Sequence, residues 1–136
     1  MISLRQTAAA AALALATFLG ASVPTPAAAA EYKDFDQAAF EAAEAQGRPV
    51  LIDVSAWWCP VCAVQLGTIR RTTVAAAYDK LTIFHVNYDR EPQIWKSFGV
   101  HTQGTLIGFD HGHEVGRLAY VTDRAQINAL LASLVQ

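Results

Sequence analysis

Residues 56–62 read Ala56-Trp57-Trp58-Cys59-Pro60-Val61-Cys62 and hold both cysteines of the chain, with two residues between them. An apolar run, Val50-Leu51-Ile52-Asp53-Val54, comes shortly before this stretch and is typical of a strand buried on both faces. Pro60 suits the first position of a helix, where a missing N–H costs nothing. A strand that leads into a Cys-x-x-Cys pair at the start of a helix indicates redox chemistry.

Hydrophobic periodicity on either side of this stretch predicts alternating helices and strands. The expected elements are an edge strand at 32–35, a helix capped by Asp34 or Asp36 and running to about Gln46, a strand at 50–54, a helix at 59–71, a short helical turn at 74–78, a strand at 81–87, a helix from Pro92 to Gly99, strands at 105–109 and 114–120 around a tight turn, and a last helix capped by Thr122. This order predicts one α/β domain, with a central mixed sheet of four or five strands and helices on both faces.

Two helices have a recognisable apolar face. Cys62, Leu66 and Ile69 fall at i, i+4 and i+7, so they are expected to form the buried stripe of the helix at 59–71. In the last helix the apolar spacing is more regular, and the predicted buried stripe consists of Ile127, Leu130, Leu131 and Leu134. Lone aromatic residues such as Trp95 and Tyr120 are expected in the core.

The N-terminal segment predicts export. A positive charge at Arg5 is followed by an apolar stretch at 7–20 and by an Ala-x-Ala site at 28–30, the pattern of a cleaved signal peptide. A retained membrane anchor is the alternative, but the apolar core is shorter than the ~20 residues that a span needs. We therefore expect a signal peptide at 1–30, a domain at 31–136 and a periplasmic location.

Charge and cysteine count narrow the function further. The chain has 12 acidic and 10 basic residues, a formal net charge of −2, which argues against a nucleic-acid surface because such a surface needs a basic face. Export places the cysteines in an oxidising compartment. A disulfide across two intervening residues closes almost no loop and so stabilises the fold little. The pair is therefore interpreted as a working thiol pair.

The expected roles follow from the helix start. Cys59 at the N-cap faces free N–H groups and the positive end of the helix dipole, which stabilise a thiolate, so we expect it to be the exposed nucleophile. Cys62 lies one turn later on the inward side and is expected to be the buried resolving thiol. Asp53 interrupts the apolar strand, and burial disfavours its charged form, which makes it a candidate proton acceptor. Trp58 is expected to flank the thiol as a flat substrate contact, and Pro60 stiffens the first turn.

Metal binding is the alternative use of such a pair. A lone Cys-x-x-Cys is half of a zinc site, and histidines would have to complete it. Two ligands could come from His85, His101, His111 and His113, but nothing in the sequence places the His111-x-His113 turn beside the cysteines. An iron–sulfur cluster bound between the Cys-x-x-Cys motifs of two chains is a further alternative. We expect no metal and no cofactor other than the redox-active disulfide Cys59–Cys62.

Residues 53–62 resemble the active-site region of the thioredoxin family, in which an Asp stands six residues before the first Cys and a Trp directly precedes that Cys. The similarity continues through 87–89, 98–100, 105–107 and 112–115, in order, and covers essentially all of 31–136. It implies a thioredoxin fold and thiol–disulfide exchange. The implied roles are Cys59 as nucleophile, Cys62 as resolving thiol and Asp53 as buried proton acceptor.

Three positions depart from the family pattern. Gly104 stands where the family has a cis-proline, and Gln103 takes the place of the residue that pairs with the substrate backbone. A cis bond without proline costs ~2.5–4 kcal/mol, so the Gln103–Gly104 bond is expected to be trans. His85 stands where many members have a Lys, and is either a core histidine bonded to backbone or the partner of Asp53 in a proton relay. Gly67 replaces a proline that kinks the helix.

The direction of electron flow depends on the residues around the pair. Strongly oxidising periplasmic members of the family have proline first and usually histidine second, and they carry an inserted helical domain. Here Pro60 is followed by Val61, and the domain leaves no room for an insertion. We therefore expect a monomeric reductase of protein disulfides, kept reduced by a membrane-bound electron donor. A thiol oxidant, or a module that holds copper or an iron–sulfur cluster, is the alternative.

Overall fold

A five-stranded mixed sheet forms the centre of the protein, in the strand order β1-β3-β2-β4-β5. The computed structural model describes residues 28–136, so nearly all of the predicted signal peptide lies outside the described residues. β1, β3 and β2 run parallel, β4 is antiparallel to β2, and β5 is antiparallel to β4. The strands are β1 (Glu31–Asp34), β2 (Val50–Ser55), β3 (Thr82–Asn87), β4 (Thr105–Asp110) and β5 (His113–Ala119). This confirms the predicted mixed sheet.

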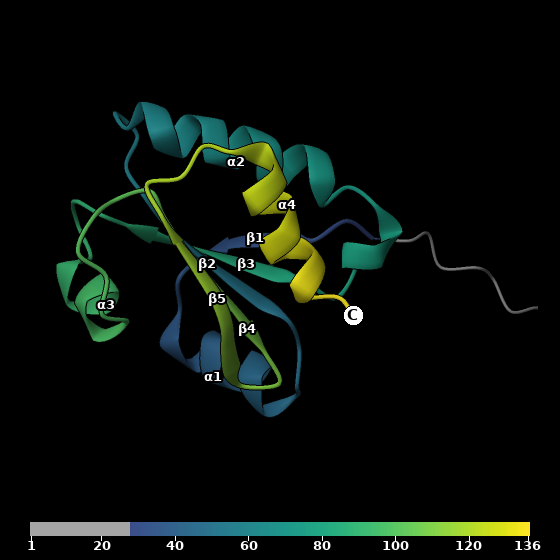
Figure 1. The fold of residues 1–136 in the computed structure, drawn as a ribbon. Helices are drawn as coiled ribbons and strands as arrows, with labels where there is room; N and C mark the ends of the chain where they lie inside the picture. The colour runs from purple at the N-terminus through teal and green to yellow at the C-terminus, as the bar shows by residue number, and fades with distance from the viewer. Residues whose placement is uncertain (1–27) are drawn as a thin grey trace, which may run out of the picture.

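Helices cover both faces of this sheet, as Figure 1 shows: α2 and α4 lie above it in that view, and α1 lies below it. The helices are α1 (Gln37–Ala45), α2 (Pro60–Thr72), α3 (Pro92–Ser97) and α4 (Arg124–Ser133), with a 3₁₀ turn η1 at Ala76–Tyr78. None of the helices in residues 28–136 has the length and apolar character needed to cross a membrane.

Side-chain oxygens cap two of the helices. Asp36 Oδ1 accepts the N–H of Ala39 at 2.8 Å, and Asp123 Oδ1 accepts the N–H of Gln126 at 2.9 Å. The prediction of Thr122 as the cap of the last helix is therefore wrong by one residue. Thr and Asp both cap helices well, so the sequence alone does not decide between neighbours.

Strand β2 separates two hydrophobic clusters. Its residues alternate, so that Val50, Ile52 and Val54 pack with the phenylalanines on the α1 side. Leu51 belongs to the cluster under α2 and α4. All of Val50–Val54 is buried, which confirms the prediction of a central strand covered on both faces.

The two predicted helix stripes have different outcomes. The four leucine and isoleucine positions predicted for α4 are all buried, as expected. In α2, however, Leu66 is only half-buried, while Gln65 and Thr68 are buried beside Cys62 and Ile69. Because α2 also packs against α4, its buried stripe is rotated toward Gln65 and Thr68, and this rotation brings Gln65 under the active-site loops.

Candidate active site

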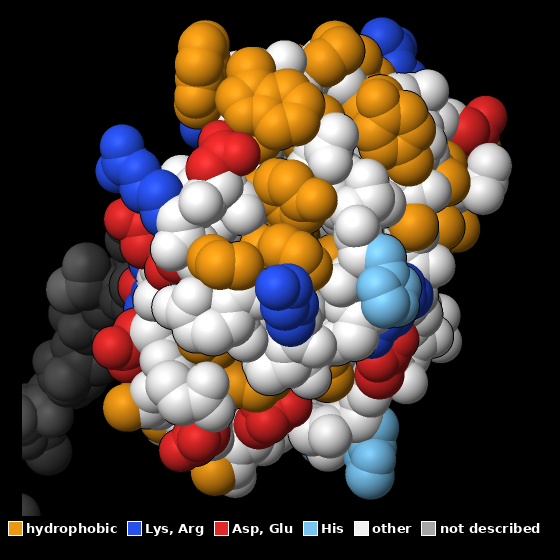
Figure 2. Space-filling view, turned by 90° about the vertical axis from the view of Figure 1, so that its left-hand side faces the viewer, with side chains coloured by type: hydrophobic (Ala, Val, Ile, Leu, Met, Phe, Trp, Pro, Cys, Tyr) orange, Lys and Arg blue, Asp and Glu red, His pale blue; other side chains and the backbone are white. Residues whose placement is uncertain are grey.

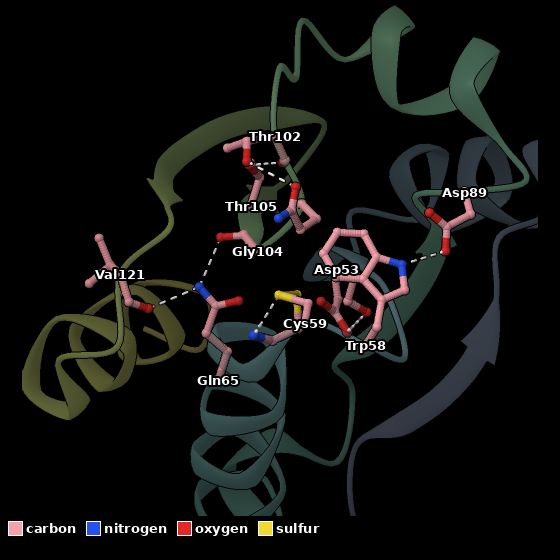
Figure 3. The surroundings of a disulfide bond; sticks show 12 residues. Asp53, Trp58, Cys59, Gln65, Asp89, Thr102, Gly104, Thr105 and Val121 are labelled. Atoms are coloured by element: carbon pink, nitrogen blue, oxygen red, sulfur yellow. Dashed lines mark hydrogen bonds between the residues drawn. A yellow bond between two sulfur atoms is a disulfide. The ribbon is translucent and has the colours of Figure 1, made fainter.

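Cys59 and Cys62 form a disulfide at the start of α2, shown in Figure 3. Cys59 is the N-cap of this helix, and its Sγ accepts the N–H of Cys62 at 3.1 Å. Charge that develops on Cys59 Sγ during reduction therefore meets a hydrogen-bond donor and the positive end of the helix dipole.

Both cysteines are buried in this disulfide form. Cys59 is 2 % exposed and Cys62 is 4 % exposed, so the expectation of an exposed Cys59 is wrong for the oxidised protein. The bond draws both sulfurs into one small cluster, against which Val61 and Tyr88 pack. Attack on the Cys59 sulfur thus requires a partner that fits closely against this end of α2.

Asp53 lies under α2 because residues alternate along β2. Asp53 and Ser55 fall on the same face as Leu51, and Asp53 is 4 % exposed. The parallel pairing of β2 with β3 puts His85 directly beside Asp53, with 3.9 Å between His85 Nδ1 and Asp53 Oδ2. The Ser55 hydroxyl bridges the two: it donates to Asp53 Oδ2 at 3.2 Å and lies 3.0 Å from His85 Nδ1.

His85 is partly open to solvent and strongly influenced by carboxylates. The Asp53 carboxylate raises the pKa of His85 above its ordinary value, whereas partial burial acts in the opposite direction. Asp34, which pairs with His85 across β1, and Glu91 add to the increase in pKa. The side chain is 38 % exposed and bonds to the Ser55 side chain, so the interpretation of His85 as a core histidine bonded to backbone is wrong.

An open cavity of about 600 Å³ lies behind the disulfide, between α2 and strands β1 and β3. It reaches both cysteines and the three bridged groups, so Asp53 has a route to solvent despite its burial. The residues that line the cavity include Asp34, Asp53, Ser55, Trp57, Cys59, Cys62, Leu66 and His85, and Lys33 and Arg70 add positive charge.

Two backbone hydrogen bonds hold Gly104 in its loop, and its backbone is in the left-handed region. Its φ is +72°, its N–H donates to Val54 O at 2.8 Å, and its carbonyl accepts from Tyr120 N at 2.8 Å. Every peptide bond in residues 28–136 is trans, which confirms the expectation for Gln103–Gly104. Proline has no N–H and fixes φ near −65°, so this loop is built for glycine.

Exposed aromatic side chains surround the disulfide end of the molecule, and Figure 2 shows the hydrophobic side chains that gather on this face. Trp58 is 46 % exposed, and its indole Nε1 donates to Asp89 Oδ2 at 3.0 Å. Trp57 is also exposed, and so is Tyr120, with a φ of +59° that is unusual for a bulky residue. The expectation of a core position for Tyr120 is therefore wrong.

Residues 31–133 match the sequence profile of the thioredoxin family. The chain belongs to the thioredoxin family. It is 33% identical to a thioredoxin of Alicyclobacillus acidocaldarius, over 71% of this chain and 91% of that one. The crystal structure of Trxlp from Edwardsiella tarda EIB202 superposes on this protein with a TM-score of 0.70. The two sequences are 36% identical, and the match covers 78% of this chain and all of that one. A Malassezia sympodialis thioredoxin, 19% identical over 79% of this chain and 95% of its own with a TM-score of 0.67, shares the fold.

Membership of the thioredoxin family, together with the Cys59–Cys62 disulfide, makes the protein a thiol–disulfide oxidoreductase that acts on protein thiols and disulfides. The predicted fold and reaction class are confirmed. The structure also gathers the residues predicted for the site at one end of the sheet: Cys59, Cys62, Asp53 and His85 meet at the cavity, and Trp58, Pro60, Gln103 and Gly104 belong to the segments around the disulfide.

Four residues of this thioredoxin-family site were not predicted in these roles. Ser55 follows Asp53 by two positions in a strand, and Gln65 follows Cys62 by three in a helix, so each shares a face with a predicted residue. Asp89, which holds Trp58, and Tyr120, which packs on Gly104, are brought in by turns far along the chain, and no local pattern marks them.

Two of the histidines considered as metal ligands lie far from the disulfide. His111 and His113 are in the β4–β5 hairpin, where His111 lies against Gly47, at the opposite end of the sheet from the disulfide. Within residues 28–136, no cluster of three or more His, Cys, Asp or Glu side chains is arranged to hold a metal ion.

The Gly104 geometry predicts that restoring proline harms this protein. Gly104→Pro removes the hydrogen bond to Val54 O and cannot adopt a φ of +72°, so it should lower the free energy of unfolding by more than about 1 kcal/mol and change turnover with a protein disulfide. Gly104→Ala keeps the N–H and should be less harmful, although its Cβ would lie 3.3 Å from Val61 Cγ1. Urea unfolding and insulin reduction measure both effects. Wild-type stability and kinetics in Gly104→Pro would contradict this account of the loop.

Proposed function

We propose that this protein reduces protein disulfides in the cell envelope through Cys59 and Cys62. The observation that carries the direction is the set of donors around Cys59 Sγ: it receives the backbone N–H of Cys62, while Val61, between the cysteines, offers no side-chain donor. A thiolate with few donors is stabilised less, which keeps the reduced form reactive and the reduction potential low.

The exchange proceeds through a mixed disulfide. The Cys59 thiolate attacks one sulfur of the substrate disulfide, which breaks and releases the other substrate sulfur as a thiolate. Cys62 then loses its proton and attacks Cys59 Sγ, so that the second substrate sulfur leaves and the Cys59–Cys62 disulfide forms. Two electrons pass from the protein to the substrate, and no other cofactor takes part.

Asp53 is the group proposed to take the proton from Cys62. It lies buried under α2 and lines the same cavity as Cys62. Ser55 connects Asp53 to His85, and the half-exposed His85 ring passes the proton to solvent. The proposed relay residue His85 thus stands at the position where many members of the family are expected to have a lysine.

The substrate is held by the residues around the disulfide. Trp58, fixed by Asp89, offers a flat apolar contact beside Cys59, and Pro60 presents no N–H toward the sulfurs. On the other side, Gln103 is proposed to pair with the substrate backbone, and Gly104 lets an extended chain approach closely. The proposed partners are proteins that carry an accessible disulfide.

Export rests on the sequence of residues 1–30 and on the alanines before Glu31. The proposal includes cleavage after about Ala30, a periplasmic monomer, and a membrane-bound donor that returns electrons to Cys59–Cys62. N-terminal sequencing of the protein from the periplasmic fraction should begin at or near Glu31. A full-length protein retained in the cytoplasm would contradict this part of the proposal.

Insulin reduction and the reduction potential test the direction. The wild type should reduce insulin in the presence of dithiothreitol, and Cys59→Ser should abolish that activity because the attacking sulfur is gone. Cys62→Ser should instead trap a mixed disulfide. A potential close to about −270 mV supports a reductant, whereas a value close to about −120 mV would make the protein a thiol oxidant.

The His85 geometry predicts a pH dependence with a defined sign. A charged His85 cannot accept the proton that Asp53 takes from Cys62, so exchange should accelerate as the pH rises through the pKa of His85, which Asp53 raises above its ordinary value of about 6.5. His85→Ala should lose this step in the pH profile, and the exposed His113→Ala should keep it. An unchanged profile in His85→Ala would remove His85 from the mechanism.

The raised pKa of His85 also predicts how the stability of the folded protein depends on pH. Because the folded protein holds the His85 proton more tightly, the wild type should exceed His85→Ala in stability most at a pH below about 6.5, and the difference should shrink as the pH rises through the folded pKa. Urea midpoints at pH 5.5 and 8.5 measure this difference.

A further inference from the structure

Gln65 is a fully buried amide at the point where α2 meets the active-site loops. Its exposed fraction is 0 %, and its Nε2 donates to Gly104 O and to Val121 O, each at 2.9 Å. Both acceptors are carbonyl oxygens, which cannot donate. The amide nitrogen must therefore face them, and this fixes the direction in which the oxygen points.

The Gln65 oxygen, in contrast, has no hydrogen-bond partner among the described residues. A buried acceptor without a donor is unfavourable, because it has lost its hydrogen bonds to water, so such an atom needs an explanation. It lies beside Gly104, since a Cβ built there would be 3.6 Å from Gln65 Oε1. In Figure 3 this oxygen points toward the side on which the Cys59 sulfur lies.

Cys62 is a possible donor on the same face of α2. It precedes Gln65 by three positions in α2, so the two side chains share one helix face, and both are buried. A disulfide sulfur carries no hydrogen and can offer nothing to this oxygen. A thiol at the same position has an S–H group that is a weak donor.

We propose that Gln65 is a positioning residue of the exchange reaction: its nitrogen holds the Gly104 loop, and its oxygen accepts the S–H of Cys62 in the reduced protein. Reduction by an external dithiol adds two electrons and two protons to the Cys59–Cys62 bond. The proton on Cys59 leaves to give the thiolate, and the proton on Cys62 stays in the bond to Gln65 Oε1. Asp53, from the cavity side, removes it when Cys62 attacks.

This bond exists in only one redox state. It stabilises the reduced form relative to the disulfide, and it keeps the Cys62 thiol protonated and oriented until a mixed disulfide has formed. The inference rests on exchange at Cys59 and Cys62, and it holds whichever way the electrons run. Loss of the acceptor should therefore favour the disulfide in equilibrium with a thiol buffer.

Redox titration against glutathione tests this with a matched pair of variants. Gln65→Met, similar in length but without donor or carbonyl, should shift the equilibrium about threefold toward the disulfide, a potential lower by ~14 mV. Gln126→Met, an exposed glutamine on α4, should leave the equilibrium unchanged. An equilibrium in Gln65→Met equal to that of Gln126→Met overturns the proposal.

Infrared spectroscopy tests the bond itself and separates it from the loop contact. In Cys59→Ser only the Cys62 thiol remains, and its S–H stretching band should lie at lower frequency than that of a free thiol in water. Adding Gln65→Met should return the band toward the frequency of an apolar, unbonded thiol. A band in Cys59→Ser that already lies at the unbonded frequency overturns the proposal. This outcome does not require the Gln65 variant to fold. It also leaves the proposed function intact if the wild type reduces insulin.

Discussion

The pairing of β2 with its two neighbours sets the position of nearly every group in the site. On one side, the register with β3 brings His85 beside Asp53, and the alternation of β2 adds Ser55 to the same face. On the other side, the Val54 carbonyl accepts the N–H of Gly104 and so fixes the loop before β4. The end of β2 also delivers the chain to the N-cap of α2. A shift of one residue in this register would turn Asp53 to the opposite face of the sheet and separate it from the cysteines.

The strongest local patterns in the sequence were sufficient for the fold and for the centre of the site. Apolar runs identify β2 and α4, and the Cys-x-x-Cys pair after a strand identifies the redox chemistry, because these signals depend on neighbours in the chain. The exposure of Tyr120, the rotation of the α2 stripe and the burial of Cys59 were not predictable in this way. Each depends on which distant segment packs against the residue, and periodicity carries no information on that.

Gly104 shows how a loop that a proline can restrict is held in a different way when glycine stands at that position. A proline restricts a loop through its ring, whereas this protein restricts the same loop from outside, through bonds to Val54, Gln65 and Tyr120. The two solutions exclude each other, because the N–H that binds Val54 is the group that proline lacks. The loop is thus held by several segments of the chain, so its position reports on the packing of α2 and of the β5–α4 turn.

The cavity behind the disulfide gives the proton a route to solvent that is separate from the proposed substrate-docking surface. The proposed substrate-docking surface is on the side of Trp58 and the Gly104 loop, while none of residues 88–136 lines the cavity that reaches Asp53. A docked substrate therefore leaves the solvent route of the proton open while electrons cross the covered interface. The proton of Cys62 can then reach bulk water through this cavity without release of the bound partner.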